Sequence, residues 1–354
     1  MKWQKKFVST LVLAFIFLCI WILWSSDEMK DSLLLHKKNY DYMKDFILSP
    51  PVTYCKKSSF LTIIVTSYVG HVELRSAHRR AMPADLLESM NVTRVFLLSK
   101  IPVTEKYITQ AAIINELSIY KDILQGSFVE NYRNLTLKHL MGLRWASNVC
   151  RPTYILKVDD DTVFSLEGTY KLLLKLGIQE TVLMGYMLNN TVPRRNIENK
   201  WYVTQQEYNL NKYPEYLSGW YYITTSSVAT RLCDMALYQP HFWIDDIYIT
   251  GILRNILGLK LIQVPEDYWL EYYELLECCM TDMTKKFIRC EYVVGPNGGR
   301  NNLILEFNEA LRNCDNQKNC MVRPIDKPLK RVCFVKRERD IFSKGQGKVE
   351  LIQA

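Results

Sequence analysis

The stretch Tyr154–Asp161, with the sequence YILKVDDD, decides the fold class that this chain predicts. Its first part, Tyr154–Val158, is a short apolar run with β-branched residues, as expected for a strand buried inside a sheet. Outward along the chain, runs of the same kind predict further strands at Phe60–Thr66 (FLTIIVT), Val95–Leu98 (VFLL) and Val182–Met184.

Helical periodicity separates these predicted strands. Apolar residues three or four positions apart share one face of a helix, and two such sets are Ile113, Leu117 and Tyr120, and Leu137, Met141 and Trp145. A further helical stretch covers Leu166–Leu176. Because strands and helices alternate, we expect an α/β fold with a parallel-type sheet covered by helices. Such sheets bind ligands just beyond the carboxyl ends of their strands.

Three adjacent carboxylates, Asp159, Asp160 and Asp161, stand at that expected position. They repel one another, and a divalent cation would relieve the repulsion. Residues i and i+2 of an extended backbone point the same way, so Asp159 and Asp161 can face one ligand while Asp160 points elsewhere. Oxygen ligands suit Mn²⁺ or Mg²⁺. A loop or a helix cap explains the triplet equally well, because aspartate favours both.

A second acidic pair, Asp245 and Asp246, lies in the stretch WIDDIYITGIL, where a helix is expected to start. Taken alone, the pair favours a helix cap. The alternative is a general base, but a helix start lowers the pKa of a carboxylate. That role therefore requires burial or a neighbouring carboxylate to raise the pKa.

Aromatic residues are dense in the segment Lys200–Tyr222. They could form the wall of a sugar site, because aromatic faces stack on the apolar faces of sugars and glycine allows close approach. A buried aromatic core is the alternative explanation for any one of them. The residues concerned are Tyr213, Pro214, Tyr216, Gly219, Trp220 and Tyr221.

Composition is that of a globular protein, since the 354 residues are 48% hydrophobic and 23% charged. The net charge of +8 is spread along the chain and gives no reason to expect a nucleic-acid partner. At the N-terminus, the apolar run Phe7–Trp24 is long enough to span a bilayer. Lysines precede it, which predicts a cytosolic tail at 1–6 and a lumenal chain after the anchor. A cleaved signal peptide, and hence a secreted lectin-like protein, is the alternative.

Nine of the ten cysteines follow the predicted anchor, and they include no C-x-x-C pair. Structural zinc is therefore not expected, whereas a lumenal location favours disulfides. The odd number leaves one thiol unpaired or intermolecular, and the connectivity stays open. The sequons at Asn91, Asn134 and Asn189 agree with a lumenal location.

Several blocks, in order from Phe60 to Val264, resemble the β1,3-glycosyltransferases of glycosyltransferase family 31. The blocks are LRSAHRRAM (Leu74–Met82), VFLL, the E-x-x-x-Y-x-D-I residues Glu116, Tyr120, Asp122 and Ile123, ENYRNLTLKHL, YILKVDDD, KWYV…YPEYLSG and IDDIYITG. The resemblance implies a GT-A (Rossmann-like) domain at 58–320, behind a single transmembrane signal-anchor at 7–24 and a lumenal stem at 25–57. A basic C-terminal tail, 321–354, follows. It also implies a type II protein of the Golgi membrane.

The same resemblance implies an inverting hexosyltransferase that moves galactose, or N-acetylglucosamine, from a UDP-sugar to a glycoprotein or glycolipid in β1,3 linkage. Mn²⁺ or Mg²⁺ would assist. Carried over position by position, Asp161 resembles the metal ligand and Asp246 the general base. The residues that would contact the nucleotide or the donor sugar are Arg75, Arg79, Asp159, Asp160 and Gly219.

One departure from the family concerns the end of the metal site. Members often carry a late histidine there, whereas the last histidine of this chain is His241, and the stretch EYVVGPNGGRNNL offers Asn297 and Arg300. This departure motivates a second hypothesis, a catalytically inactive member that acts as a binding or chaperone-like partner in the Golgi. The sequence leaves the acceptor and the oligomeric state open.

Overall fold

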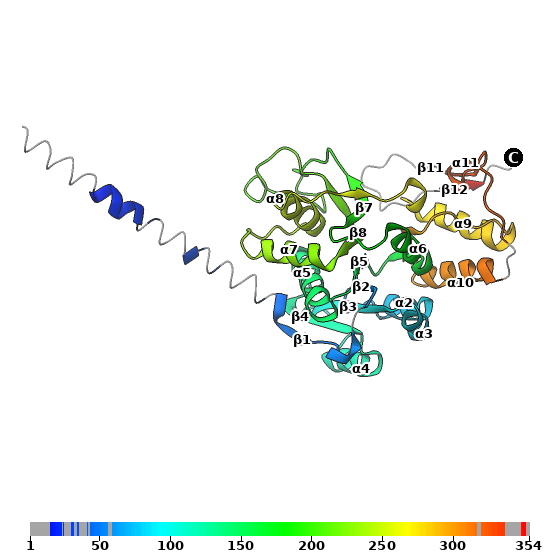
Figure 1. Cartoon of the computed structure of the whole chain (residues 1–354), viewed down its shortest axis with the longest axis horizontal. Helices are drawn as coiled ribbons and strands as arrows, with labels where there is room; N and C mark the ends of the chain where they lie inside the picture. Colours follow the sequence, from blue (N-terminus) through cyan, green and yellow to red (C-terminus); the bar gives the residue numbers. More distant parts are fainter. Residues whose placement is uncertain are drawn as a thin grey trace, which may run out of the picture.

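The structure is a computed structural model of the chain (Figure 1). It describes residues 15–22, 24, 30, 31, 34, 41, 43–55, 59–316, 320–336 and 348–351. These residues contain no helix long and apolar enough to cross a membrane. Of the predicted anchor 7–24, residues 7–14 and 23 lie outside the described part.

A central sheet of eight strands runs in the order β1-β4-β3-β2-β5-β8-β7-β9 (Figure 1). Strands β4, β3, β2 and β5 are parallel to one another, whereas β8 runs antiparallel to both β5 and β7. The strands are β1 (Phe46–Leu48), β2 (Leu61–Thr66), β3 (Val92–Lys100), β4 (Ile123–Val129), β5 (Tyr154–Asp159), β7 (Leu183–Leu188), β8 (Tyr216–Thr225) and β9 (Ile262–Gln263). The α/β prediction is confirmed, but the sheet is mixed.

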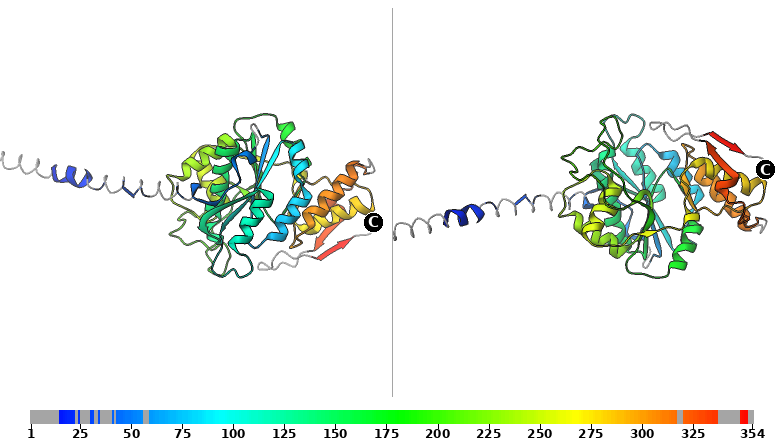
Figure 2. Two further views of the ribbon diagram at one scale, coloured as in Figure 1. Left: turned by 90° about the horizontal axis from the view of Figure 1, so that it is seen from below. Right: turned by 90° about the horizontal axis from the view of Figure 1, so that it is seen from above.

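Helices cover both faces of this sheet, with α5 and α7 on one side and α2, α6 and α10 on the other (Figures 1 and 2). Alternate residues of one strand enter the two cores: Ile63 and Val65 face one layer of helices, and Ile64 the other. The helices are α2 (Val72–Ala81), α3 (Ala84–Ser89), α4 (Gln110–Tyr120), α5 (Leu135–Trp145), α6 (Leu166–Leu176), α7 (Ser226–Ala236), α8 (Arg254–Ile256), α9 (Tyr273–Lys285), α10 (Leu303–Asn316) and α11 (Leu329–Val332).

The C-terminal part packs beside the sheet through α9 and α10 (Figure 2). Strand β10 (Val294–Pro296) pairs with β6 (Thr162–Phe164), the short strand that directly follows the aspartate triplet. Strands β11 (Cys333–Lys336) and β12 (Lys348–Leu351) form a separate pair. This pairing of β10 with β6 brings residues near position 297 to the carboxyl end of β5.

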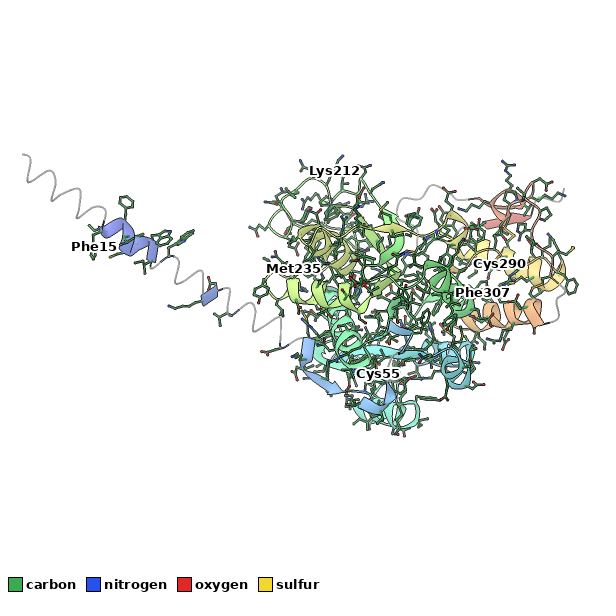
Figure 3. All side chains as sticks on the ribbon, viewed as in Figure 1. Phe15, Cys55, Lys212, Met235, Cys290 and Phe307 are labelled. Carbon is green, nitrogen blue, oxygen red and sulfur yellow. A yellow bond between two sulfur atoms is a disulfide. The ribbon has the colours of Figure 1, made fainter. Side chains whose placement is uncertain are left out.

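Disulfides tie distant segments together, as predicted for a lumenal chain. Eight of the nine cysteines that follow the predicted anchor are paired, and Cys233 is free and buried. Figure 3 labels Cys55 near the N-terminal strands and Cys290 in the C-terminal part. The pairs are Cys55–Cys150, Cys278–Cys333, Cys279–Cys290 and Cys314–Cys320. The prediction of one unpaired thiol is confirmed, and the disulfide to Cys333 shows that the packed domain continues beyond residue 320.

Candidate active site

A cavity of about 670 Å³ opens at the carboxyl ends of β2 and β5, where the sequence predicts a ligand site. Residues of both acidic groups line it, although about eighty-five positions separate the groups along the chain. The predicted site residues along its wall are Asp159, Asp160, Asp161, Gly219 and Asp246, together with Asp245.

Asp160, the middle carboxylate of the triplet, is held by the loop that follows β2. Its Oδ2 accepts a hydrogen bond from Ser67 Oγ at 2.7 Å and lies 2.9 Å from His71 Nδ1. Burial opposes the charged form, but the bonds from His71 and Ser67 hold the pKa of Asp160 below its ordinary value. Its side chain is 8% exposed. Asp160 therefore anchors the β2–α2 loop, and the other two carboxylates face the cavity more openly.

Lys157, which the sequence analysis treated only as part of a strand, joins the two acidic groups. Its Nζ lies 2.6 Å from Asp159 Oδ1 and 3.9 Å from Asp245 Oδ2, and it also donates a hydrogen bond to the Gly219 carbonyl. Burial favours the neutral amine, but the two carboxylates raise the pKa of Lys157 above its ordinary value. A single buried cation thus fixes β5, β8 and the Asp245–Asp246 pair in one arrangement.

Asp245 is the ionised member of the second pair. Its Oδ2 lies 3.0 Å from Nδ1 of the buried His139 on α5, and His139 Nε2 lies 2.5 Å from the Tyr222 hydroxyl. Although burial opposes ionisation, His139 and Lys157 lower the pKa of Asp245 to about 2. Burial lowers the pKa of His139 to about 4, so this histidine is neutral near pH 7.

Asp246 has the opposite character. Its Oδ1 accepts the Ile247 amide at 2.8 Å, so the predicted capping role is present. Burial, followed by the negative charge of Asp245, nevertheless raises the pKa of Asp246 to about 7. Burial and a neighbouring carboxylate are the two conditions that a general base at a helix start needs. The carboxylate therefore caps the π-helical turn Ile247–Leu253 and also reaches the cavity with a pKa suited to proton transfer.

Gly219 on β8 lies directly against Asp246. A Cβ atom at this position would lie 2.9 Å from Asp246 Cβ and 3.4 Å from both Cγ and Oδ2. Carbon atoms pack at about 3.5–4.0 Å, so any side chain here would displace the carboxylate. The absence of a side chain at Gly219 is what allows Asp246 to occupy its position.

Arg75 and Arg79, predicted to lie near the nucleotide, are not among the residues that line the cavity. Arg75 is fully buried and pairs with Glu116 at 2.8 Å, and its Nη1 also donates to the Tyr68 carbonyl. Arg79 pairs with Glu116 and with Asp122, both at 2.7 Å. The two sequence blocks that carry these residues therefore pair through their side chains. They support the β2–α2 loop through the bond from Arg75 to the Tyr68 carbonyl.

Asp161 is the carboxylate best suited to a metal ion. It is exposed to the cavity and forms no ion pair with any residue that the structure describes, whereas Asp159 and Asp160 have cationic or hydrogen-bonding partners. The described residues contain no group of three or more metal-ligating side chains. An ion held by one carboxylate and by substrate phosphates, which is how Mg²⁺ commonly binds, needs no such group. The Asp161 environment fits that kind of site.

The residues considered in place of a late histidine have separate positions. The Asn297 amide donates to the Asp161 carbonyl at 3.1 Å, so this residue adjoins the triplet through its backbone. Arg300 instead pairs with Glu277 and Glu306 on the surface. Arg300 is therefore not part of the cavity.

Further residues of the cavity were missed by sequence reasoning. Lys138 is buried, pairs with Glu130 at 2.6 Å and donates to the Ser67 carbonyl. The Thr66 hydroxyl is buried at the end of β2 and has no hydrogen-bond partner among the residues that the structure describes. Aromatic rings of Tyr132 and Trp243 line the opposite part of the wall. The residues of the segment Lys200–Tyr222 that line the cavity are Lys200, Trp201, Gly219 and Trp220. Tyr213, Tyr216 and Tyr221 are core residues, as the alternative explanation predicted.

Known proteins are similar to this chain over more than half of its length. Beta-1,3-galactosyltransferase 2 of Homo sapiens is 28% identical over 244 residues, which cover 68% of this chain and 57% of that protein. UDP-GalNAc:beta-1,3-N-acetylgalactosaminyltransferase 1 of Sus scrofa is 29% identical over 275 residues, 75% of this chain and 81% of that protein. This chain therefore spans little more than half the length of the first relative.

Solved structures that align with this chain at low TM-score include a galactosyltransferase, LgtC, in complex with donor and acceptor sugar analogues. It has a TM-score of 0.37 and 9% identity, and the match covers 75% of this chain and 98% of LgtC. The mannosyltransferase PcManGT of Pyrobaculum calidifontis, in complex with GDP-Man and Mn²⁺, has a TM-score of 0.36 and 11% identity. That match covers 85% of this chain and 87% of the mannosyltransferase.

The family model described as galactosyltransferase matches residues 74–265, more than half of the 354 residues. These limits enclose the aspartate triplet, Gly219 and Asp246. The prediction of the family from the ordered motifs is confirmed: the chain belongs to the galactosyltransferase family of β1,3-glycosyltransferases.

Proposed function

We propose that this family member is an active, inverting hexosyltransferase that uses a UDP-sugar and forms a β1,3 linkage. Sugar transfer itself follows from the family. The observation that carries the finer proposal is that one buried cation, Lys157, holds both acidic groups at a single cavity. One group can serve the departing diphosphate and the other the incoming hydroxyl.

The donor half of the cavity lies at the ends of β2 and β5. The unpartnered Thr66 hydroxyl offers a hydrogen bond to a bound nucleotide, and Ser67 and His71 hold Asp160 in place beside it. Asp161 would hold Mn²⁺ or Mg²⁺ together with diphosphate oxygens, and the ion would neutralise the charge that develops on the leaving UDP. Arg75 acts on this half only through the loop it supports.

The acceptor half centres on Asp246. A carboxylate whose pKa is about 7 can take a proton from an acceptor hydroxyl, and its ionised fraction rises from about half near pH 7 toward completion above it. The acceptor oxygen then attacks the anomeric carbon from the face opposite to UDP, which inverts the configuration. Asp245 stays ionised and holds His139, so the charge beside Asp246 is constant through the reaction.

The donor is galactose or N-acetylglucosamine in this proposal. The name of the pig relative adds N-acetylgalactosamine as a third sugar to test. We further propose that the protein is a type II protein of the Golgi membrane and acts on a glycoprotein or glycolipid. The inactive-partner alternative rests on the missing late histidine alone.

The test is a donor screen. The full-length chain, purified in detergent, is incubated with Mn²⁺, one UDP-sugar at a time and a mixture of acceptor glycosides, and the released UDP is measured. We expect acceptor-dependent release with one of the three sugars. No release with any sugar, combined with no binding of UDP, would favour the inactive partner.

A further inference from the structure

Three aromatic side chains from separate segments meet at the wall of the cavity beside Asp246. Tyr132 belongs to the turn Tyr132–Asn134, Trp201 to the loop between β7 and β8, and Trp243 precedes the acidic pair. Lys212, labelled in Figure 3, marks the same β7–β8 loop at the edge of the molecule. We call Tyr132, Trp201 and Trp243 the aromatic wall.

Specific contacts fix the aromatic wall in one arrangement. Trp201 Nε1 donates to the Tyr132 hydroxyl at 2.9 Å, and the rings of Tyr132 and Trp243 meet edge to face at 5.9 Å. The Lys200 ammonium lies 4.4 Å from the centre of the Tyr132 ring, and the Arg133 guanidinium lies 4.5 Å from that of Trp243. The three rings are therefore held together by hydrogen bonding and by cation–π attraction.

The exposure of the three rings suggests a ligand. Tyr132 and Trp201 are 41% and 48% exposed, so part of each ring stays open to solvent although the Lys200 ammonium lies over both rings. Trp243, in contrast, is buried, with 6% of its surface exposed, and its Nε1–H donates to no acceptor among the described residues. A buried donor without a partner costs stability. A bound ligand that offers an oxygen atom would satisfy it.

The position of the aromatic wall separates it from the donor half. Trp243 stands three residues before Asp246, and the negative charges of Asp245 and Asp246 act on the Tyr132 hydroxyl more strongly than that of Asp159. Thr66, Ser67 and His71, which belong to the donor half, lie at the ends of the parallel strands instead. A general base must lie within hydrogen-bonding distance of the hydroxyl that it deprotonates. The group bound next to Asp246 is therefore the acceptor.

We propose that the aromatic wall is the acceptor subsite, that it takes a terminal pyranose sugar by stacking on Trp201 and Tyr132, and that the Trp243 Nε1–H donates a hydrogen bond to an oxygen of that sugar. This inference rests on the proposed function, because it uses Asp246 as the base. Trp201 and Trp243 are binding residues in this account. Lys200 and Arg133 position the rings.

The test measures acceptor binding separately from donor binding. The full-length chain in detergent, with UDP and Mn²⁺ present, is applied to an array of glycans that end in hexoses or N-acetylhexosamines, and the affinity for the best glycan is then titrated. Trp243→Phe keeps the ring but removes the N–H, and we expect affinity to fall about 3- to 10-fold. Trp201→Ala removes the stacking face, and we expect a loss of about 10-fold.

Tyr107→Ala is the matched control, because Tyr107 is 92% exposed and does not line the cavity. It should leave glycan affinity unchanged. Affinities of Trp243→Phe and Trp201→Ala within twofold of the wild type would overturn the subsite, as would a wild-type protein that binds UDP but no glycan. A wild-type protein that binds glycans but not UDP would instead overturn the proposed function and leave the subsite as a lectin-like site.

Discussion

The contact between Gly219 and Asp246 gives a sharp prediction, the effect of Gly219→Ala. Gly219 has no positive φ angle, so alanine is compatible with its backbone conformation. The new Cβ, however, would lie 2.9 Å from Asp246 Cβ. To restore a carbon–carbon separation of about 3.5 Å, the carboxylate and its segment must retreat by about 0.6 Å.

A displacement of this size should slow catalysis strongly but destabilise the fold only moderately. A misplacement of about 1 Å at a reacting group costs about 100-fold in rate, so we expect kcat to fall by about 10- to 100-fold. Overpacking of this kind costs about 1–3 kcal/mol, and the disulfide-linked domain should still fold. The binding of UDP and Mn²⁺ should change little, because the three atoms nearest the new Cβ all belong to Asp246.

The assay compares kcat for sugar transfer, KM for the donor and thermal stability in the full-length chain. Gly295→Ala on β10 is the matched control, because its new Cβ would meet nothing closer than 3.4 Å. We expect the control to retain wild-type kcat. If Gly219→Ala keeps wild-type kcat and only raises the KM for the donor, Gly219 acts on the donor sugar and the contact with Asp246 has no catalytic role.

Three further predictions concern charge. Lys157→Met should lower the free energy of unfolding by about 3 kcal/mol, because it leaves buried carboxylates without a cation. Lys171→Met, at a 63% exposed side chain, should not. Equal thermal midpoints for the two variants would contradict the stabilising role of Lys157. The kcat/KM should rise with pH and level off above about 7, as Asp246 loses its proton, and a flat profile from pH 5 to 8 would argue against this base. Burial lowers the pKa of His78 to about 4, so its contribution to stability is complete above pH 6.5 and is lost toward pH 4. On acidification, the thermal midpoint of the wild type should therefore fall relative to that of His78→Gln. A difference between the two midpoints that does not depend on pH would refute this.

Three of the four parallel strands, β2, β3 and β5, could be predicted because they carry strong local signals, whereas β4 was missed. The runs at Phe60–Thr66 and Tyr154–Val158 appear as β2 and β5 with nearly the same limits, and the helical stretch Leu166–Leu176 is α6. Strand β8 was missed because its residues lie in the aromatic segment Lys200–Tyr222, where ring density suggested a sugar site. The run Val182–Met184 did predict β7, but the antiparallel pairing of β8 with β5 and β7 joins distant segments, which no local pattern encodes.

The carboxylates of the candidate site were predicted from the sequence, whereas the residues that pair with them were not. A lysine inside a strand that is buried on both faces needs a negative partner, so Lys157 did carry a signal that was available from the sequence. His139 carried none, because its partner Asp245 lies 106 positions away. Arg75 is part of a family block, and its buried ion pair with Glu116 could not be predicted from that block alone.

The central claim, that Asp246 deprotonates the acceptor while Asp161 serves the diphosphate, is tested most directly by two isosteric variants. Transfer rates and the affinity for UDP with Mn²⁺ are measured for Asp246→Asn and Asp161→Asn in the full-length chain. We predict that Asp246→Asn loses about 100- to 10,000-fold in transfer and keeps its affinity for UDP, whereas Asp161→Asn loses both. Transfer at the wild-type rate by Asp246→Asn would contradict the account, because an asparagine side chain cannot take the proton of the acceptor hydroxyl.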